Sequence, residues 1–352
     1  MKIDNPFTLT FGRQPGKFIN RYEDMANIIN TFTSENSISQ TYLISGVRGC
    51  GKTVLMTSVV KELCATTDWI SADLNSTQDL LEDFANRLAD SMKKNNLLSE
   101  AGIDISIAGF GIGLSGSKQE RDSVSKIESL LEQAKKKNKR VIISIDEVTP
   151  NESMKKFASQ FQIFIRKEYP VYLIMTGLYD NIYAIQNDPK LTFLLRSPKI
   201  LLEPLSLHQI ASQYQTIFEC SEDKGRSLAV YTQGYAFAFQ ALGLLYWEYK
   251  DDLSFENILK KFDELLDDFA YKKIWSSLTP VEKNIIDVMT TKKEISVKEI
   301  REKLNMQSNN FSKYRERLIN KGLVKSPAHG ILEFTLPRFD ILAKSYIAFE
   351  KE

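Results

Sequence analysis

The strongest constraint on the fold is a segment, residues 46–53, that reads Gly-Val-Arg-Gly-Cys-Gly-Lys-Thr. It matches the pattern G-x-x-x-x-G-K-[ST], in which glycines let backbone N–H groups turn inward around phosphate groups. The apolar run at residues 41–45 predicts a strand before the segment, and residues 52–63 predict a helix after it. This order is the setting that a phosphate-binding loop requires, because the N-terminus of the helix also favours negative charge.

The loop predicts which residues would hold a nucleotide. Lys52 would reach the β- and γ-phosphates and assist catalysis, and the Thr53 hydroxyl would complete the shell of Mg²⁺. The predicted cofactors are therefore ATP and Mg²⁺. The predicted nucleotide-binding residues of the loop are Gly46, Val47, Arg48, Gly49, Cys50, Gly51, Lys52, Thr53 and Val54.

A pair of adjacent carboxylates ends another predicted strand. Residues 141–145 are an uninterrupted apolar run, and Asp146 and Glu147 follow it directly. Asp146 would hold Mg²⁺ through water, and Glu147 would orient and deprotonate the attacking water. The alternative interpretation is a Glu147 that is merely exposed at the end of a strand.

Two further residues are candidates for catalysis. Thr176 is the first polar residue after the apolar run at residues 171–175, so its hydroxyl would lie at a strand tip and touch the γ-phosphate or the attacking water. An ordinary threonine at the end of a strand is the alternative. Arg196, which comes just before the helical part of the chain, would act as a charge-sensing or finger arginine, with a surface ion pair as the alternative.

Continuous apolar runs, separated by helical segments, predict the fold class. Strands are expected at residues 41–45, 68–74, 141–145 and 171–175, and helices at residues 21–32, 78–92 and about 154–166. Runs without alternation suit strands that are covered on both faces. We therefore expect an α/β P-loop domain with a parallel sheet over residues 1–202.

Other segments depart from this alternation. The apolar run at residues 191–202 is interrupted by Pro198. Residues 104–114 alternate apolar side chains, partly with glycines between them, and predict an inserted β-hairpin. Residues 203–274 show helical segments with little strand signal, which predicts a helical lid subdomain.

The pattern changes again in residues 275–352. Thr279 and Ser296 are predicted N-caps of two helices, a third helix is expected at residues 309–320, and residues 330–335 predict a strand. Three helices and a β wing predict a winged helix-turn-helix domain. Its third helix would enter the DNA major groove with Asn309, Asn310, Lys313 and Arg317 facing outward. Many winged helices contact proteins instead, and that alternative stays open.

Composition excludes several function classes. The formal net charge of +1 hides a division, because residues 271–352 hold 16 Lys and Arg against 10 Asp and Glu, and residues 1–270 hold 30 against 35. Two histidines leave little material for a histidine metal site or a serine-type triad. Three cysteines without C-x-x-C spacing, and a start without a signal-peptide profile, predict a cytoplasmic location. Residues 227–247 are uncharged but include polar groups, so a buried helix is expected rather than a membrane span.

These residues together resemble the prokaryotic ATPases of the AAA+ superfamily, near the archaeal origin-recognition initiators and the signalling (STAND-type) NTPases. The resemblance rests on Asn5-Pro6-Phe7-Thr8 with Phe11-Gly12, the loop at residues 46–53, Asp146-Glu147, Thr176-Gly177-Leu178 and the helical lid. It implies an additional-strand sheet. The resemblance also implies that Arg21 lies at the nucleotide site, although this chain reads Asn20-Arg21-Tyr22 where such proteins often read Gly-Arg-Glu. Residues 233–237 lack the sensor arginine of initiator-like members, which implies slow, switch-like hydrolysis.

The sequence therefore predicts a cytoplasmic, Mg²⁺-dependent ATPase whose nucleotide state controls a winged-helix module that binds double-stranded DNA. The alternative is a STAND-like signalling ATPase whose winged helix makes protein or autoinhibitory contacts. A protein partner or a homo-oligomer fits both hypotheses, because a finger arginine implies a neighbouring subunit. No membrane partner is expected.

Overall fold

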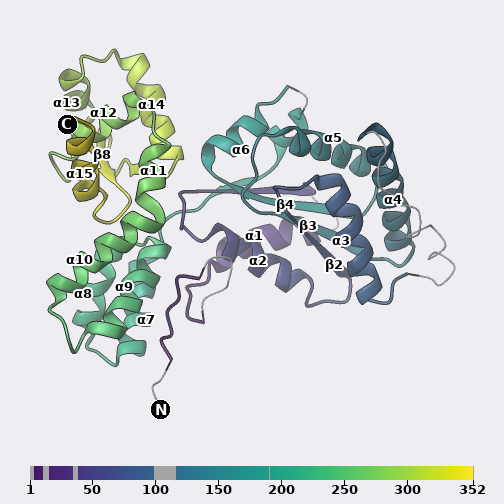
Figure 1. Cartoon of the computed structure of the whole chain (residues 1–352), viewed down its shortest axis with the longest axis horizontal. Helices are drawn as coiled ribbons and strands as arrows, with labels where there is room; N and C mark the ends of the chain where they lie inside the picture. Colours follow the sequence, from purple (N-terminus) through teal and green to yellow (C-terminus); the bar gives the residue numbers. More distant parts are fainter. Residues whose placement is uncertain (1–3, 11–15, 35–38, 99–115, 190, 352) are drawn as a thin grey trace. The chain divides into compact units, whose positions relative to one another are not determined.

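The computed structural model describes residues 4–10, 16–34, 39–98, 116–189 and 191–351 (Figure 1). The chain divides into two compact units. We call residues 21–45 and 52–200 the sheet unit, and residues 1–20, 46–51 and 201–352 the helical unit. The hairpin predicted at residues 104–114 lies outside the described residues, and the division into three domains at residues 202 and 274 stays a prediction.

A five-stranded sheet forms the centre of the sheet unit. Its order is β2-β3-β4-β1-β5, and the pairs β2–β3, β3–β4 and β1–β4 are parallel. The predicted α/β class with a parallel central sheet is confirmed. The strands are β1 (Thr41–Ser45), β2 (Trp69–Leu74), β3 (Arg140–Ile145), β4 (Val171–Gly177) and β5 (Lys199–Leu201).

Helices cover both faces of this sheet. In Figure 1, α1 and α2 lie on one side of it, and α3, α4 and α5 lie on the other. A core of buried side chains joins these last three helices to the strands, and Phe84, Phe157 and Phe164 are fully buried in it. The helices are α1 (Tyr22–Thr33), α2 (Lys52–Leu63), α3 (Leu80–Lys94), α4 (Gly116–Lys136), α5 (Glu152–Arg166) and α6 (Tyr179–Gln186).

Burial explains why the strand runs lack alternation. All five residues of β1 are buried, as are five of the six residues of β3, which is expected when helices cover both faces of a sheet. The run at residues 191–202 is different. It forms a 3₁₀ helix, η3 (Thr192–Arg196), and then the short strand β5, with Pro198 between them.

The helical unit includes the lid, which we define as residues 203–274. Its helices are α7 (Leu207–Phe218), α8 (Glu222–Thr232), α9 (Ala236–Tyr249), α10 (Phe255–Leu266) and the π-helical turn η4 (Asp267–Tyr271), and α11 (Lys272–Ser276) continues from it into the next residues. The uncharged stretch at residues 227–247 is not one helix, because Gln233 and Gly234 adopt φ of 46° and 78° and separate α8 from α9. Within the part of the chain that the structure describes, no helix has the length and apolar character to cross a membrane.

The C-terminal module, which we define as residues 275–352, combines helices with a small antiparallel sheet. Its helices are α12 (Pro280–Met289), α13 (Val297–Lys303), α14 (Ser308–Asn320) and α15 (Phe339–Lys351). The strands β6 (Ile295–Ser296), β7 (Val324–Lys325) and β8 (Ile331–Phe334) pair in the order β6-β8-β7. Thr279 and Ser296 accept hydrogen bonds from backbone N–H groups at the starts of α12 and α13, as predicted.

Candidate functional site

The strand order decides which side chains meet at one edge of the sheet. In the parallel register Ile145 of β3 pairs with Met175 of β4, and Ser45 of β1 pairs with Gly177 of β4. The three strands therefore end at the same edge. Because β4 lies between β1 and β3, its last residues separate the strand before the phosphate-binding loop from the strand before the acidic pair.

The loop itself has the backbone conformation that its glycines predict. Gly49 and Gly51 adopt φ of 77° and 98°, which side-chain-bearing residues rarely adopt. The helix α2 then begins at Lys52, as expected from the sequence. Lys52 is only 8% exposed, so the protein covers most of its side chain.

Thr53 and Asp146 meet directly. The Thr53 hydroxyl donates a hydrogen bond to Asp146 Oδ2 at 2.7 Å, although the two residues come from α2 and from the end of β3. A hydroxyl and a carboxylate in this arrangement match the few protein ligands that Mg²⁺ takes when phosphates and water supply the others. Within the described ranges, no group of three or more His, Cys, Asp or Glu side chains could hold a metal ion by itself.

Thr176 contacts both members of the acidic pair. Its side chain is fully buried, and its hydroxyl donates to Asp146 Oδ1. The Glu147 N–H in turn donates to Asp146 Oδ1 at 3.0 Å and to Thr176 Oγ1 at 3.3 Å. The threonine at the tip of β4 thus fixes the orientation of the Asp146 carboxylate.

Glu147 lies in an unusual backbone conformation. Its φ is 50°, a value that is uncommon for a residue other than glycine, and such residues gather at functional sites. Its side chain is exposed, whereas Val148 directly after it is fully buried. The turn therefore directs the Glu147 carboxylate away from the core, where it could act on a water molecule.

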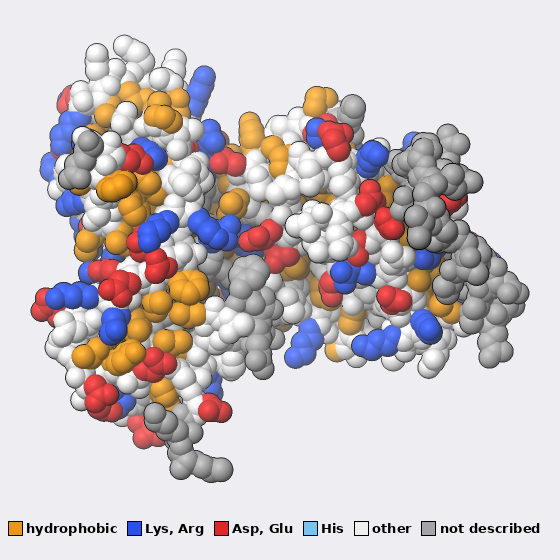
Figure 2. Space-filling model, viewed as in Figure 1, with side chains coloured by type: hydrophobic (Ala, Val, Ile, Leu, Met, Phe, Trp, Pro, Cys, Tyr) orange, Lys and Arg blue, Asp and Glu red, His pale blue; other side chains and the backbone are white. Residues whose placement is uncertain are grey.

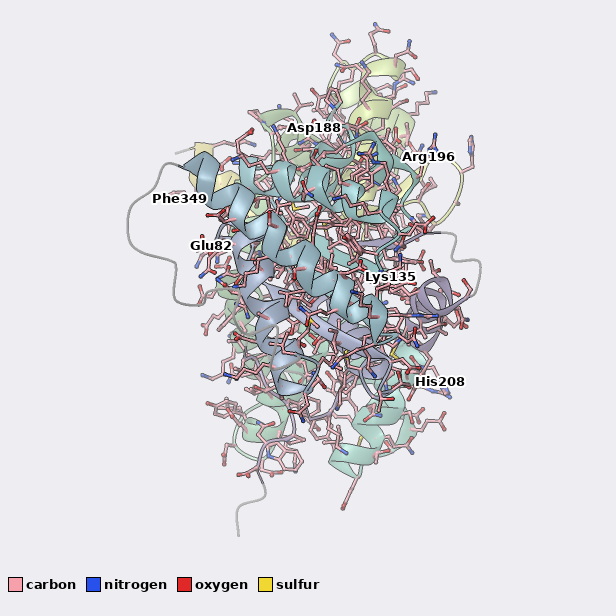
Figure 3. All side chains as sticks on the ribbon, turned by 90° about the vertical axis from the view of Figure 1, so that its right-hand side faces the viewer. Glu82, Lys135, Asp188, Arg196, His208 and Phe349 are labelled. Carbon is pink, nitrogen blue, oxygen red and sulfur yellow. The ribbon has the colours of Figure 1, made fainter. Side chains whose placement is uncertain are left out.

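The two candidate arginines lie in different surroundings. Arg21 precedes α1, its side chain is 12% exposed, and its Nη1 lies 3.8 Å from Asp24 Oδ2. Arg196 ends η3, and its side chain is exposed (Figure 3). The predicted roles of Arg21 at the nucleotide and of Arg196 as a finger stay predictions.

The predicted DNA-contacting residues of α14 are not equivalent. Asn309, Asn310 and Lys313 are exposed. Arg317 is only partly exposed, and its Nε lies 3.3 Å from Oε1 of Glu282, a carboxylate that is fully buried. Figure 2 shows several Lys and Arg side chains on the surface of this module.

The sequence did not predict two of these contacts, the ion pair of Arg317 with Glu282 and the hydrogen bond of Thr176 to Asp146. Glu282 also accepts hydrogen bonds from the Thr279 N–H at 2.8 Å and from Lys321 Nζ at 3.2 Å. The spacing Thr-x-x-Glu at residues 279–282 is the signal of a capping box, and it could have identified Glu282 but not its partner Arg317. The bond between Thr176 and Asp146 required the strand order, which the sequence does not show.

Comparisons with known proteins agree with this geometry. Residues 18–169 match the model of a family described as an ATPase domain predominantly from Archaea. Residues 269–341 match a family described as a domain of unknown function, DUF8462. No protein of established annotation matches the chain.

Solved structures show the same fold. The Walker-type ATPase PABY2304 of Pyrococcus abyssi is 15% identical, with a TM-score of 0.62 over 95% of this chain and 97% of that one. Cdc6p from Pyrobaculum aerophilum is 15% identical, with a TM-score of 0.52 over 99% of each chain. The chain therefore shares its fold with these two proteins, and its residues 18–169, which include the phosphate-binding loop and the acidic pair, match the model of an ATPase domain.

Proposed function

We propose that this chain binds ATP together with Mg²⁺, hydrolyses it slowly, and uses its nucleotide state to control a winged-helix module that binds double-stranded DNA. The observation that carries the proposal is the hydrogen bond of 2.7 Å between Thr53 and Asp146. It brings the end of the phosphate-binding loop and the acidic pair together, as a nucleotide site with a metal ion requires. A cytoplasmic location is part of the proposal, since Cys50, Cys64 and Cys220 form no disulfide with one another.

Each residue of the site has a proposed role. Lys52 would bind the β- and γ-phosphates, and Thr53 and Asp146 would hold Mg²⁺. When bound, Mg²⁺ would neutralise charge that develops on the phosphate oxygens. Glu147 would accept a proton from the attacking water, and Thr176 would hold Asp146 in position.

The rate of hydrolysis is proposed to be low. Residues 233–237 read Gln-Gly-Tyr-Ala-Phe and contain no arginine. An arginine that stabilises the charge of the transition state contributes a factor of about 10³–10⁵ in rate. Arg196 could supply this charge from the same chain or from a neighbouring subunit, which would make turnover depend on assembly.

The C-terminal module supports the DNA-binding part of the proposal. Along the chain the elements follow in the order α12, β6, α13, α14, β7 and β8, and the three strands form one antiparallel sheet. This is the element order of a winged helix. Exposed Asn309, Asn310 and Lys313 lie on α14, where asparagine could bind adenine edges and lysine could bind phosphates. The excess of Lys and Arg over Asp and Glu in residues 271–352 adds a favourable field for DNA.

Two variants test the ATPase. Lys52→Ala should abolish nucleotide binding, and Glu147→Gln should keep binding and stop turnover, because the amide cannot accept the proton. Binding is measured by calorimetry with Mg²⁺, and turnover by phosphate release. Lys61→Ala is the matched control, since Lys61 is an exposed lysine on the same helix. Wild-type affinity and hydrolysis in Lys52→Ala would refute the assignment.

A signalling ATPase with a protein-binding module is the second candidate. The ion pair of Arg317 with buried Glu282 favours it, because this arginine already has a partner within the module. Mobility shifts with duplex DNA at several salt concentrations separate the two candidates. Binding that weakens with salt and falls in Lys313→Ala, but not in the exposed control Lys298→Ala, supports DNA. A chain that binds no duplex at low salt supports the protein partner.

A further inference from the structure

Two residues at the start of α9 contact the backbone of the phosphate-binding loop, and all of the groups involved belong to the helical unit. The Tyr235 hydroxyl donates a hydrogen bond to the Arg48 carbonyl oxygen at 2.5 Å. The Phe237 N–H donates to the Gly49 carbonyl oxygen at 3.1 Å. Two consecutive carbonyl groups of the loop are therefore held by the lid.

The Tyr235 side chain lies directly against the loop. A side chain at Gly49 would overlap the Tyr235 hydroxyl and would also meet Cβ of Phe237 at 3.0 Å. Tyr235 is only 3% exposed, and this burial raises its pKa above the ordinary value of 10.0. The hydroxyl is therefore protonated at neutral pH and stays a hydrogen-bond donor.

The direction of this bond matters for phosphate binding. A trans peptide group is planar, so its N–H points away from its carbonyl oxygen. Holding the Arg48 carbonyl toward Tyr235 turns the Gly49 N–H to the opposite side. A loop that binds phosphate needs N–H groups on the phosphate side and carbonyl oxygens away from it, because those oxygens repel an anion. The contact stabilises that orientation.

The ring of Tyr235 rests on a second buried tyrosine. Tyr271 is fully buried, and the two rings stack with their centroids 6.4 Å apart and an interplanar angle of 26°. The Tyr271 hydroxyl donates to the Pro337 carbonyl oxygen at 2.7 Å. Tyr271 is thus fixed by the C-terminal module, and it limits the positions that the Tyr235 ring can take.

We propose that Tyr235 is a positioning residue of the nucleotide site, which sets the orientation of the Arg48–Gly49 peptide group for phosphate binding. The inference rests on the proposed binding of ATP and adds a lid residue to it. Because the hydroxyl touches the loop backbone and not the reacting atoms, it acts on affinity for phosphates and not on the chemical step.

The test compares two buried tyrosines of the lid. Tyr235→Phe removes the hydroxyl bound to Arg48. Tyr214→Phe removes a hydroxyl that donates to the Phe239 carbonyl oxygen at 2.7 Å, in another part of the lid. Affinities for ATP and ADP with Mg²⁺ are measured by calorimetry, and kcat and KM by phosphate release. Both variants lose one buried hydrogen bond, so their melting temperatures should fall alike.

We expect Tyr235→Phe to bind ATP and ADP about fivefold more weakly, which is the effect of one hydrogen bond. Its KM should rise, and its kcat should stay within about twofold of the wild-type value. Tyr214→Phe should leave both affinities unchanged. Tyr271→Phe should weaken binding in the same direction by a smaller factor, and it serves as the second variant should Tyr235→Phe fail to fold. Equal nucleotide affinities of Tyr235→Phe and Tyr214→Phe would overturn the inference, but would not contradict the proposed ATPase function. A wild-type chain that binds no nucleotide would refute the proposed function instead.

Discussion

Replacing Thr176 with valine removes one hydroxyl and keeps the shape of the side chain. That hydroxyl donates to Asp146 and accepts the Glu147 N–H. A hydrogen bond to a charged group contributes about 1.5–3 kcal/mol, and a long bond of a neutral N–H contributes about 0.5 kcal/mol. Thr176 is fully buried, so water cannot replace the lost partner. We expect the free energy of unfolding of the sheet unit to fall by about 2–3 kcal/mol.

The loss of the hydroxyl should also lower turnover. Residues that orient a metal ligand typically contribute about 10- to 100-fold in metal affinity or activity. Thr176→Val should therefore lower ATP turnover at limiting Mg²⁺ by about this factor, and excess Mg²⁺ should restore part of it. If Thr176 only ended a strand, Thr176→Val would leave ATP turnover unchanged at limiting and at excess Mg²⁺.

The assay needs a probe for the sheet unit and a matched control. Trp69 is buried at the start of β2, so its fluorescence in a chain with Trp247 and Trp275 replaced by phenylalanine would follow urea unfolding of this unit. Thr41→Val is the control, because Thr41 is also buried in the sheet and bonds the neutral Ser197 hydroxyl. We expect it to lose about 1 kcal/mol and no activity. Equal turnover in the two variants would refute the reasoning.

Two further predictions concern the C-terminal module. Lys283 lowers the pKa of Glu350 below its ordinary value of 4.5. The stabilisation from this carboxylate is therefore complete above pH 4.5 and is lost as the pH falls below it. Glu350→Gln should make the free energy of unfolding, measured with urea, fall less steeply between pH 7 and pH 3. Arg317→Ala should destabilise the module by about 1–3 kcal/mol because it removes one of several partners of buried Glu282, whereas Lys313→Ala should stay within about 0.5 kcal/mol of wild type.

The sequence predicted most of the sheet unit, because its signals are local. The helix α2 starts and ends where its apolar spacing predicts, and the Val171–Gly177 strand extends the expected run by two residues. The sequence also supports placing Asp146 near Thr53, since parallel strands end at a common edge. These inferences depend on neighbours in the chain and on one general rule of sheet geometry.

The parts that the sequence did not predict depend on distant residues. The turn at Gln233 and Gly234 divides an uncharged stretch that has no proline to mark a break. The strands β6 and β7 have only two residues each, too few for a pattern. Arg317 has the exposed spacing of a surface residue on α14, and its ion pair with Glu282, 35 residues earlier in the chain, follows from the packing of α14 against α12.

The π-helical turn η4 changes the direction in which the side chains after it point around the helix axis. In this turn the Lys272 N–H donates to the carbonyl oxygen of Asp267, five residues earlier, so the turn holds one residue more than an α-helix would. Each residue of an α-helix turns the chain by about 100°. Without the additional residue, Tyr271 would face another side of the helix, and it could not touch Tyr235 and Pro337 together. The insertion of a single residue thus sets the register in which the lid meets the C-terminal module.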